Sequence, residues 1–277
     1  MTVVQGSDYP NGHLLVDVEW VDEHRFSPNV ILLDARSEGY QAGHIPGAVP
    51  LHVKDVKDTS NHTFVRSDRL QHVLEAAGLN NDTTIIVYDE GGGVLAARLF
   101  YVLEYLGLKD QVKLLNGGYT AWASAAKEIS TESPDVPAGS ITISADSLRV
   151  VTKEDIQKGL VNSVLLDVRS AEEYAGLDKR NNRKGGHIKG AIHKEWKEAL
   201  DPPDEAGVIR FKPYAALKRE FEVLGLRTDQ TIVPYCQSNQ RGAHSYFVLR
   251  LLGYSDIRPY EGSWDEWGND EHTEVFV

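Results

Sequence analysis

Cys236 is the only cysteine among the 277 residues, and it stands where a thiol could act as a nucleophile. It follows residues 231–235, an apolar run long enough for one buried strand. A polar loop, residues 237–242, then leads into a helical pattern. In a strand–loop–helix arrangement, backbone N–H groups and the positive end of the helix dipole point toward the residue at the strand end. This arrangement favours an anionic sulfur.

The energy needed to ionise such a thiol is modest. A free cysteine has a pKa of about 8.5, so only a few per cent is thiolate at neutral pH. Lowering that pKa by about two takes roughly 2.7 kcal/mol, within reach of a few oriented amides and a guanidinium. Arg241, five residues further on, is the natural cation. The alternative is that Cys236 is a small buried apolar residue, but the polar loop and the nearby arginine favour a reactive thiolate.

Composition restricts the classes of function. The hydrophobic content of 41% and charged content of 25% are typical of a globular protein, and the length suits one large or two ordinary domains. A net charge of −12 argues against nucleic acid or anionic membranes as partners. A single cysteine excludes an internal disulfide and a cysteine-cluster metal site. The N-terminal stretch lacks a leader pattern and no window approaches about 18 apolar residues, so we expect a soluble cytoplasmic protein.

The two halves of the chain repeat each other at four places in the same order. The matching segments are residues 32–37 (LLDARS) with 165–170 (LLDVRS), 44–48 (HIPGA) with 187–191 (HIKGA), 78–88 with 225–235, and 116–122 with 261–267. Residues 130–144, rich in proline, serine and glycine, read as a linker. We therefore predict two domains of one fold, residues 1–138 and 139–277.

Strand and helix patterns alternate within each copy. The predicted strands are residues 31–34, 84–88, 112–115, 163–167, 231–235 and 257–259, and the predicted helices are residues 69–77, 94–106, 215–224 and 242–252. This alternation predicts an α/β fold in which each domain has a mostly parallel sheet with helices on both faces. Ligands of such sheets bind beyond the carboxyl ends of the strands, where Cys236 lies.

The copies differ at the position of the cysteine. Tyr88 is followed by Asp89, whereas Tyr235 is followed by Cys236. The first loop carries two acids and no thiol, so it would repel an anionic sulfur compound. We expect the first copy to be a structural or interface half.

Together these segments resemble the tandem-domain rhodanese family, the thiosulfate and 3-mercaptopyruvate sulfurtransferases. The resemblance covers nearly the whole chain, including the two Gly-His-Ile-x-Gly-Ala motifs that begin at Gly43 and Gly186. It implies an inert first rhodanese-like domain with Asp89 in place of cysteine. It also implies a catalytic second domain whose Cys236 heads a six-residue loop that ends at Arg241.

The resemblance implies sulfur transfer through a persulfide. The Cys236 thiolate would take the outer sulfur of an anionic donor such as thiosulfate, and cyanide or a thiol acceptor would then remove it. Loop amides would stabilise the anion, Arg241 would close the loop and attract the donor, and neither a metal nor an organic cofactor would be needed. The residues expected to bind substrate are Gln237, Ser238, Asn239, Gln240, Arg241 and Arg183.

The loop sequence bears on which donor is used. It is more similar to bacterial thiosulfate sulfurtransferases, whose polar loop ends in arginine, than to the mercaptopyruvate enzymes. The family also uses an arginine shortly after its Asp-x-Arg segment, and here Glu172 and Glu173 stand in that region. An acid there disfavours mercaptopyruvate. Arg180, Arg183 and Lys184 are the cations that could compensate.

Several other polar and aromatic residues have structural explanations. Asp167 with Arg169, and His187, recur as Asp34 with Arg36, and His44, in the copy without a thiol, so we interpret them as structural. Trp196, Trp264 and Trp267 could wall a pocket, although aromatic residues near strand ends are commonly core. His244 could shuttle a proton, but we expect it to face solvent on its helix.

Other functions stay open at this point. Related folds use a Cys…Arg loop as phosphatases, but with five intervening residues, whereas Cys236 and Arg241 enclose four. A persulfide carrier that serves a partner protein needs the same thiolate as a sulfurtransferase, and mercaptopyruvate stays an alternative donor. A purely structural tandem domain would be indifferent to alkylation of Cys236. Nothing in the sequence requires more than a monomer.

Overall fold

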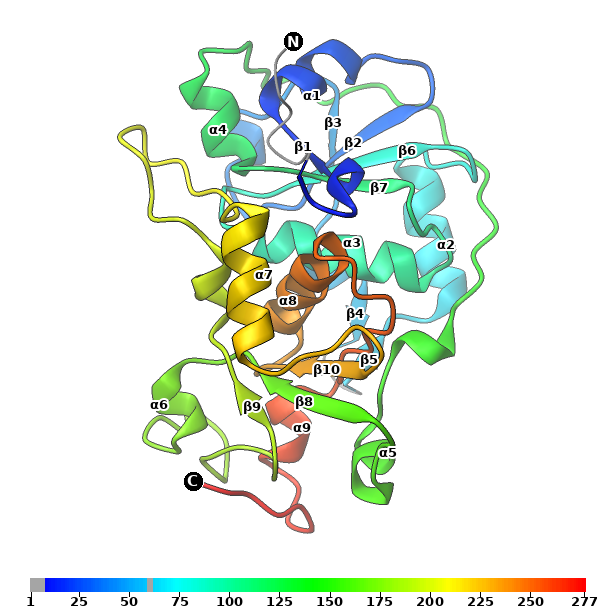
Figure 1. Cartoon of the computed structure of the whole chain (residues 1–277). Helices are drawn as coiled ribbons and strands as arrows, with labels where there is room; N and C mark the ends of the chain where they lie inside the picture. The colour runs from blue at the N-terminus through cyan, green and yellow to red at the C-terminus, as the bar shows by residue number, and fades with distance from the viewer. Residues whose placement is uncertain (1–7, 59–61) are drawn as a thin grey trace.

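The computed structural model describes residues 8–58 and 62–277. The first seven residues of the stretch that lacks a leader pattern lie outside the described residues. Two α/β units are stacked one above the other, with the chain passing from the first to the second near its midpoint (Figure 1).

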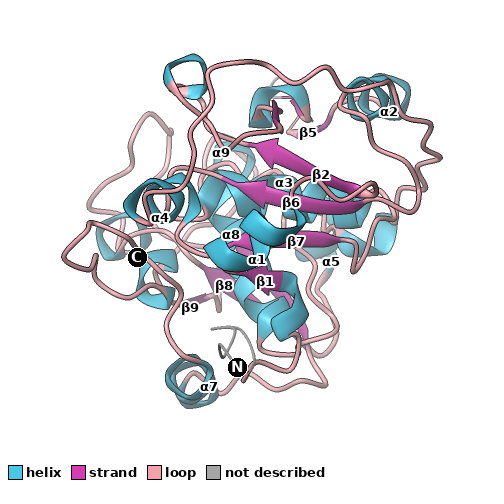
Figure 2. Ribbon diagram, turned by 90° about the horizontal axis from the view of Figure 1, so that it is seen from above, coloured by secondary structure: helices cyan, strands magenta, loops and turns pink. Residues whose placement is uncertain are grey.

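The first unit contains a five-stranded sheet in the order β1-β7-β6-β2-β3, and every neighbouring pair is parallel. The strands are β1 (Leu15–Val16), β2 (Val30–Asp34), β3 (Ala48–Pro50), β6 (Thr84–Tyr88) and β7 (Val112–Leu115). Figure 2 shows β2, β6, β7 and β1 lying side by side in that order. The central strands are buried on both faces, which explains their continuous apolar sequences. A small antiparallel hairpin, β4 (Lys57–Asp58) with β5 (Thr63–Phe64), projects toward the second unit.

The second unit has a parallel sheet in the order β10-β8-β9, made of β8 (Ser163–Asp167), β9 (Ile192–His193) and β10 (Thr231–Tyr235). The strand predicted at residues 257–259 is reduced to an isolated bridge between Ile232 and Ile257. The prediction is wrong there because Pro234 in β10 has no N–H to donate. The bonds around it form: the Ile232 N–H donates to the carbonyl of Asp256, the Arg258 N–H donates to the carbonyl of Ile232, and the Tyr260 N–H donates to the carbonyl of Pro234.

Helices cover both faces of both sheets. Their bounds are α1 (Val18–His24), α2 (Ser67–Ala76), α3 (Val94–Tyr105), α4 (Gly118–Ser124), α5 (Lys153–Lys158), α6 (Ala171–Tyr174), α7 (Tyr214–Val223), α8 (Gln240–Leu251) and α9 (Ser263–Trp267). Short 3₁₀ turns lie at η1 (Gly12–Leu14), η2 (Tyr40–Ala42), η3 (Val53–Asp55), η4 (Ser147–Arg149) and η5 (Trp196–Ala199). The helices α3 and α8, which follow the two corresponding loops, pack against each other between the sheets. The predicted fold class is confirmed.

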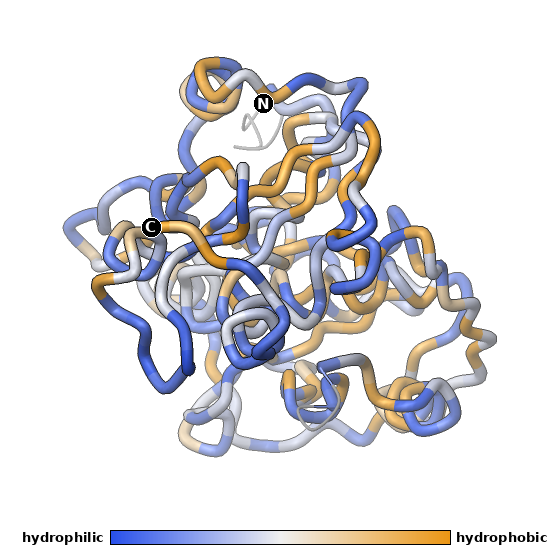
Figure 3. The backbone as a smooth tube through the Cα atoms, turned by 90° about the horizontal axis from the view of Figure 1, so that it is seen from below, coloured by the Kyte–Doolittle hydropathy of each residue, from blue (hydrophilic) through white to orange (hydrophobic). Residues whose placement is uncertain are grey.

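Three apolar clusters form the core. One lies between the first sheet and helices α1 and α4, and another lies between the second sheet and α9. The largest runs between the sheets and joins side chains of α2 and α3 to those of α7 and α8. Figure 3 shows that apolar residues run through the interior and that polar residues lie in the surface loops. Because this central core belongs to both units, the loops that end on it are held in fixed relation to each other.

Buried ion pairs also cross between the units. Glu104 of α3 accepts hydrogen bonds from Arg250 and Tyr246 of α8. Arg98 of α3 forms a two-point ion pair with Glu261 of the second unit. A buried charge without its partner is costly, so these pairs fix the way the two units meet.

The connecting stretch contains no helix or strand between residues 131 and 146 of the described chain. It runs along the first unit, where Gly139 donates its N–H to the carbonyl of Glu75 and Ser144 donates to Leu106. The domain boundary at 138/139 falls within this stretch and stays a prediction.

Candidate active site

Cys236 directly follows β10, and its backbone is held on both sides. Its N–H donates to Ser263 Oγ (3.2 Å), and its carbonyl accepts from the Trp264 N–H (2.9 Å). Only 1% of the residue is exposed. The first turn of α9 therefore fixes the strand end from which the loop departs.

The loop after Cys236 has unused backbone donors. Among the described residues, the N–H groups of residues 237–242 make no hydrogen bond to a nitrogen or oxygen acceptor. The helix α8 begins at Gln240, and Asn239 before it adopts a left-handed conformation (φ 57°). A helix start with free N–H groups is a ready site for an anion.

The corresponding loop of the first unit shows such donors in use. The carboxylate of Asp89 accepts hydrogen bonds from four backbone N–H groups, those of Gly91, Gly93, Leu95 and Ala96, at 2.9–3.3 Å. Burial raises the pKa of Asp89, and the four amides act in the opposite direction. The first loop thus folds around a carboxyl group that the chain itself supplies.

Arg241 is tied to a carboxylate that the sequence places three residues after Ser170. Its Nη1 and Nη2 atoms donate to the two carboxylate oxygens of Glu173, at 2.6 and 2.9 Å. Arg180 approaches the same carboxylate at 2.9 Å. Burial opposes the charge of Glu173, but hydrogen bonds from Arg241 and Ser170, with the charges of both arginines, lower its pKa to about 2.

Arg241 also lies close to the Cys236 sulfur. Burial opposes its charge, but hydrogen bonding with Glu173 and interaction with the Cys236 sulfur raise its pKa above the ordinary value. The guanidinium is therefore placed to balance a thiolate, although Glu173 shares its charge.

The remaining loop residues make contacts that hold the loop. Gln237 and the buried Asn182 exchange amide hydrogen bonds at 2.9 and 3.0 Å. Asn239 is fully buried and donates to Glu261 (2.7 Å). The carbonyl oxygen of Ser238 accepts a hydrogen bond from Lys57, and Gln240 borders a cavity between the units.

The first unit contributes one cation to this loop and another to Glu261, which accepts a hydrogen bond from Asn239 of the loop. Lys57 at the start of β4 is 8% exposed, and its Nζ donates to the carbonyl of Ser238 (2.5 Å). The fully buried Arg98 donates to Glu261 (2.8 Å). Burial lowers the pKa of Lys57, while Glu261 and the Cys236 sulfur act in the opposite direction. The unit expected to be a structural or interface half therefore reaches the loop that carries the thiol.

The other candidate cations lie differently. Arg183 is exposed, and its backbone N–H donates to Asn269 Oδ1 (3.0 Å). Lys184 donates to the carbonyls of Asp270 and Thr273 near the C-terminus. Of the three cations that could compensate for the missing arginine, Arg180 is the one whose contacts lead to Glu173 and Arg241. A donor-binding role for Arg183 stays a prediction.

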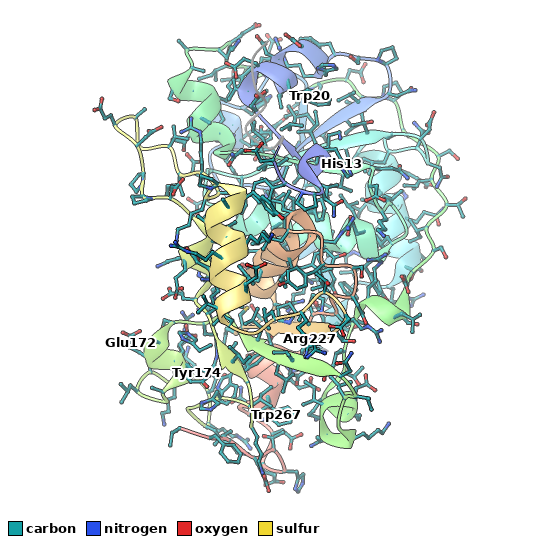
Figure 4. The ribbon with its side chains drawn as sticks, viewed as in Figure 1. His13, Trp20, Glu172, Tyr174, Arg227 and Trp267 are labelled. Atoms are coloured by element: carbon teal, nitrogen blue, oxygen red, sulfur yellow. The ribbon has the colours of Figure 1, made fainter. Side chains whose placement is uncertain are left out.

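Paired contacts in the two units account for the repeated polar motifs. Arg169 donates to Asp167 and to the carbonyl of Gly186, and Arg36 makes the equivalent bonds to Asp34 and Gly43. His187 stacks on Tyr174, which lies in the lower half of Figure 4. His44 stacks on Tyr40 in the same way. These residues therefore stabilise the chain segments that precede the Cys236 loop and the Asp89 loop.

The prediction that His244 faces solvent is wrong. The residue is 0% exposed, because α8 lies between the two units and is buried from Gly242 to Leu251. Its ring packs against Trp196 and Phe211, and neither ring nitrogen has a hydrogen-bond partner among the described residues. Burial lowers its pKa to about 3, so the imidazole is neutral at pH 7.

The tryptophans that could have walled a pocket belong mainly to the core. Trp264 and Trp267 lie in the apolar cluster on the outer face of the second sheet, with Trp267 labelled in Figure 4. Trp196 packs against the central core next to His244.

Two kinds of feature are absent from the described residues. Residues 8–58 and 62–277 include no helix that is long and apolar enough for a membrane span. The same residues contain no cluster of three or more His, Cys, Asp or Glu side chains arranged to hold a metal ion.

Comparison with known proteins agrees with the internal repeat. The model of the rhodanese-like domain matches twice, over residues 17–125 and 151–270. The chain belongs to the rhodanese-like family. Residues 126–150 lie between its two rhodanese-like domains, and the resemblance seen in the sequence is confirmed.

Named relatives of this rhodanese-like protein align over most of its length. The sulfur carrier protein TtuD of Thermus thermophilus is 33% identical and covers 94% of this chain and 95% of its own. A thiosulfate sulfurtransferase of Corynebacterium glutamicum is 32% identical and covers 95% of this chain and 90% of its own. The protein therefore belongs with sulfurtransferases and sulfur carriers, which implies a sulfur donor and a sulfur acceptor.

Solved structures show the same fold. An anaerobic ergothioneine biosynthesis enzyme from Chlorobium limicola matches with a TM-score of 0.84 at 24% identity, covering 97% of this chain and 72% of that one. The wild-type structure of EanB also matches with a TM-score of 0.84 at 24% identity, covering 96% of this chain and 69% of that one.

Sequence reasoning missed several residues around the loop. Lys57, Arg98 and Glu261 carried no motif that pointed to the thiol, and Asn182 was not singled out. One signal was available for Arg98. It is a charged residue inside an otherwise apolar helical pattern, and such a residue usually has a buried partner.

Proposed function

We propose that the protein is a sulfurtransferase that moves a sulfane sulfur from thiosulfate to a thiophilic acceptor through a persulfide on Cys236. The thiolate attacks the outer sulfur, the sulfur–sulfur bond of thiosulfate breaks, and sulfite leaves with the electron pair of that bond. An acceptor such as cyanide or a thiolate then attacks the outer sulfur of the persulfide and restores the Cys236 thiolate. No oxidant or reductant is required.

The main support for this function is that the two corresponding loops, one after Tyr88 and one after Tyr235, differ in the group that their amides can bind. In the first domain, four amides bind the carboxylate of Asp89. In the second domain, Cys236 takes the place of that acid, and the loop amides that follow it have no other acceptor among the described residues. This supports a sulfur anion held by backbone N–H groups, in the manner of an oxyanion hole.

The roles of the other loop residues follow from their contacts. Arg241 balances the thiolate, and Gln237 and Asn239 hold the loop in shape through Asn182 and Glu261. We also propose that the protein functions as a monomer. We also propose a cytoplasmic location, where a lone thiol stays reduced.

Formation of thiocyanate from thiosulfate and cyanide tests this function. We expect steady turnover by the wild type and none by the Cys236→Ala variant, with the fold of the variant unchanged by circular dichroism. Mercaptopyruvate should be tested beside thiosulfate as a donor. The 32% identity to a protein named as a thiosulfate sulfurtransferase supports thiosulfate as the donor.

A persulfide carrier is the second candidate. The 33% identity to a protein named as a sulfur carrier favours it. A carrier would take up one sulfur per chain from the donor and turn over slowly with cyanide. An enzyme would form many equivalents of thiocyanate per chain.

A further inference from the structure

The cations around Cys236 differ in how fully their charge is used. Arg241 and Arg180 both bind the carboxylate of Glu173. Arg98 binds both oxygens of Glu261. These three guanidiniums are held by carboxylates at hydrogen-bond distance, so little of their charge is available to an incoming anion.

Lys57 is held differently. Its Nζ donates to a carbonyl, that of Ser238, at 2.5 Å. The nearest carboxylate oxygen in the described part of the chain is Glu261 Oε1 at 3.7 Å, and that carboxylate already accepts from Arg98 and Asn239. Lys57 is thus a buried ammonium without a hydrogen-bonded carboxylate among residues 8–58 and 62–277.

A cavity leads from the surface to this ammonium. It has a volume of about 420 Å³, and Lys57 and Gln240, the first residue of α8, both line it. An adjoining cavity of about 460 Å³ shares Lys54 and Lys57 with it. The other charged residues that line this second cavity are Arg66, Arg69, Asp58 and Asp68. In a chain of net charge −12, a path lined by several cations would draw anions toward the Cys236 loop.

We propose that Lys57, from the first domain, binds the anionic group of the sulfur donor in the cavity between the domains. The ligand class is a small sulfur compound with a sulfonate or carboxylate group. This inference rests on the proposed function and adds a binding residue that lies outside the active loop and outside the second domain. The first domain then completes the substrate site.

Alkylation of the single thiol tests the proposal without turnover. Iodoacetate and iodoacetamide react with the same sulfur, but only iodoacetate is an anion, so the ratio of their rates reports the local attraction for anions. Lys57→Gln removes the charge and keeps a donor for Ser238, and Lys57→Arg keeps the charge. Lys113→Met is the matched control, because Lys113 also donates to a backbone carbonyl, that of His13, with a pKa lowered by burial.

We expect Lys57→Gln to lower the iodoacetate-to-iodoacetamide ratio about tenfold, and Lys57→Arg and Lys113→Met to leave it near the wild-type value. An unchanged ratio in Lys57→Gln, or an equal fall in Lys113→Met, overturns the proposal. Thermal unfolding followed by tryptophan fluorescence shows that each variant is folded. If Lys57→Gln does not fold, Lys57→Met, which keeps the apolar stem, replaces it. The same fall in the iodoacetate-to-iodoacetamide ratio is then expected, and an unchanged ratio overturns the proposal.

Steady-state kinetics provide a second readout with two donors. We expect Lys57→Gln to raise the KM for thiosulfate or for mercaptopyruvate about tenfold with little change in kcat, and the affected donor reveals which anionic group is bound. Unchanged KM values for both donors contradict the proposal. Failure of the proposed function would be a separate result, because it would appear as thiocyanate formation that persists in Cys236→Ala.

Discussion

Replacement of Glu173 by glutamine removes the charge that holds Arg241 and leaves a side chain of the same shape. Glu173 is 1% exposed, accepts two hydrogen bonds from Arg241, and lies 2.9 Å from Arg180. The variant keeps one amide oxygen as an acceptor. The change therefore isolates the charge interaction between this carboxylate and the two arginines.

The size of the effect follows from the pKa of Glu173, which is about 2 in the folded protein against an ordinary value of 4.5. Each pKa unit corresponds to about 1.4 kcal/mol, and solvent screening at the half-exposed Arg180 reduces the sum, so we expect a loss of about 2–3 kcal/mol at pH 7. The pKa is depressed on folding. The contribution is therefore present above pH 4.5 and disappears as the pH falls toward 2.

Urea unfolding followed by tryptophan fluorescence measures this difference. We expect the free energy of unfolding of Glu173→Gln to lie about 2–3 kcal/mol below that of the wild type at pH 7, with the gap closing between pH 4.5 and about pH 2. Glu172→Gln, an exposed neighbour, is the matched control and should show little change. A gap that stays constant with pH would mean that the carboxylate charge does not stabilise the fold.

Three further predictions concern buried polar groups. Asp89→Ala should leave sulfur transfer nearly unchanged but lower the free energy of unfolding by about 2–4 kcal/mol, because it leaves four amides unpaired; a large loss of transfer with full stability would contradict this. Arg98→Leu should lower the free energy of unfolding in urea by about 3–5 kcal/mol, because it leaves the buried Glu261 without its ion-pair partner, and the double variant Arg98→Leu/Glu261→Leu should recover part of this loss. A double variant less stable than the single one would argue against the ion pair. Burial lowers the pKa of His244 to about 3, whereas the unfolded value is near 6.5. The free energy of unfolding of the wild type should therefore fall by up to about 1.4 kcal/mol for each pH unit as the pH is lowered from 6.5 toward 3, and His244→Phe should lack this component. Parallel pH profiles for both proteins would refute this prediction.

The repeat was the strongest source of correct structural predictions. Residues 84–88, 112–115, 163–167 and 231–235 form strands with the predicted bounds, because each is an apolar run between polar turns. Helices α3 and α8 were also predicted, although α8 begins at Gln240 rather than 242. The strand at residues 257–259 failed because the missing donor belongs to Pro234, on another strand.

The site was predictable only where chemistry and chain position coincide. Cys236 and the following loop are adjacent in sequence, so the strand–loop–helix pattern was enough to single them out. Lys57 reaches that loop from the other domain, and Arg98 reaches Glu261 beside it, through tertiary packing that no local sequence pattern records. The burial of His244 depends in the same way on the packing of α8 between two sheets.

The proposed sulfur transfer requires that the Cys236 sulfur holds the transferred sulfur atom. Because the chain has one cysteine, the mass of the intact protein after reaction with thiosulfate and removal of excess donor tests this directly. We predict a gain equal to one sulfur atom, which is lost on addition of cyanide and absent from Cys236→Ala. An unchanged mass in the wild type during active thiocyanate formation, or the same gain in Cys236→Ala, would contradict it.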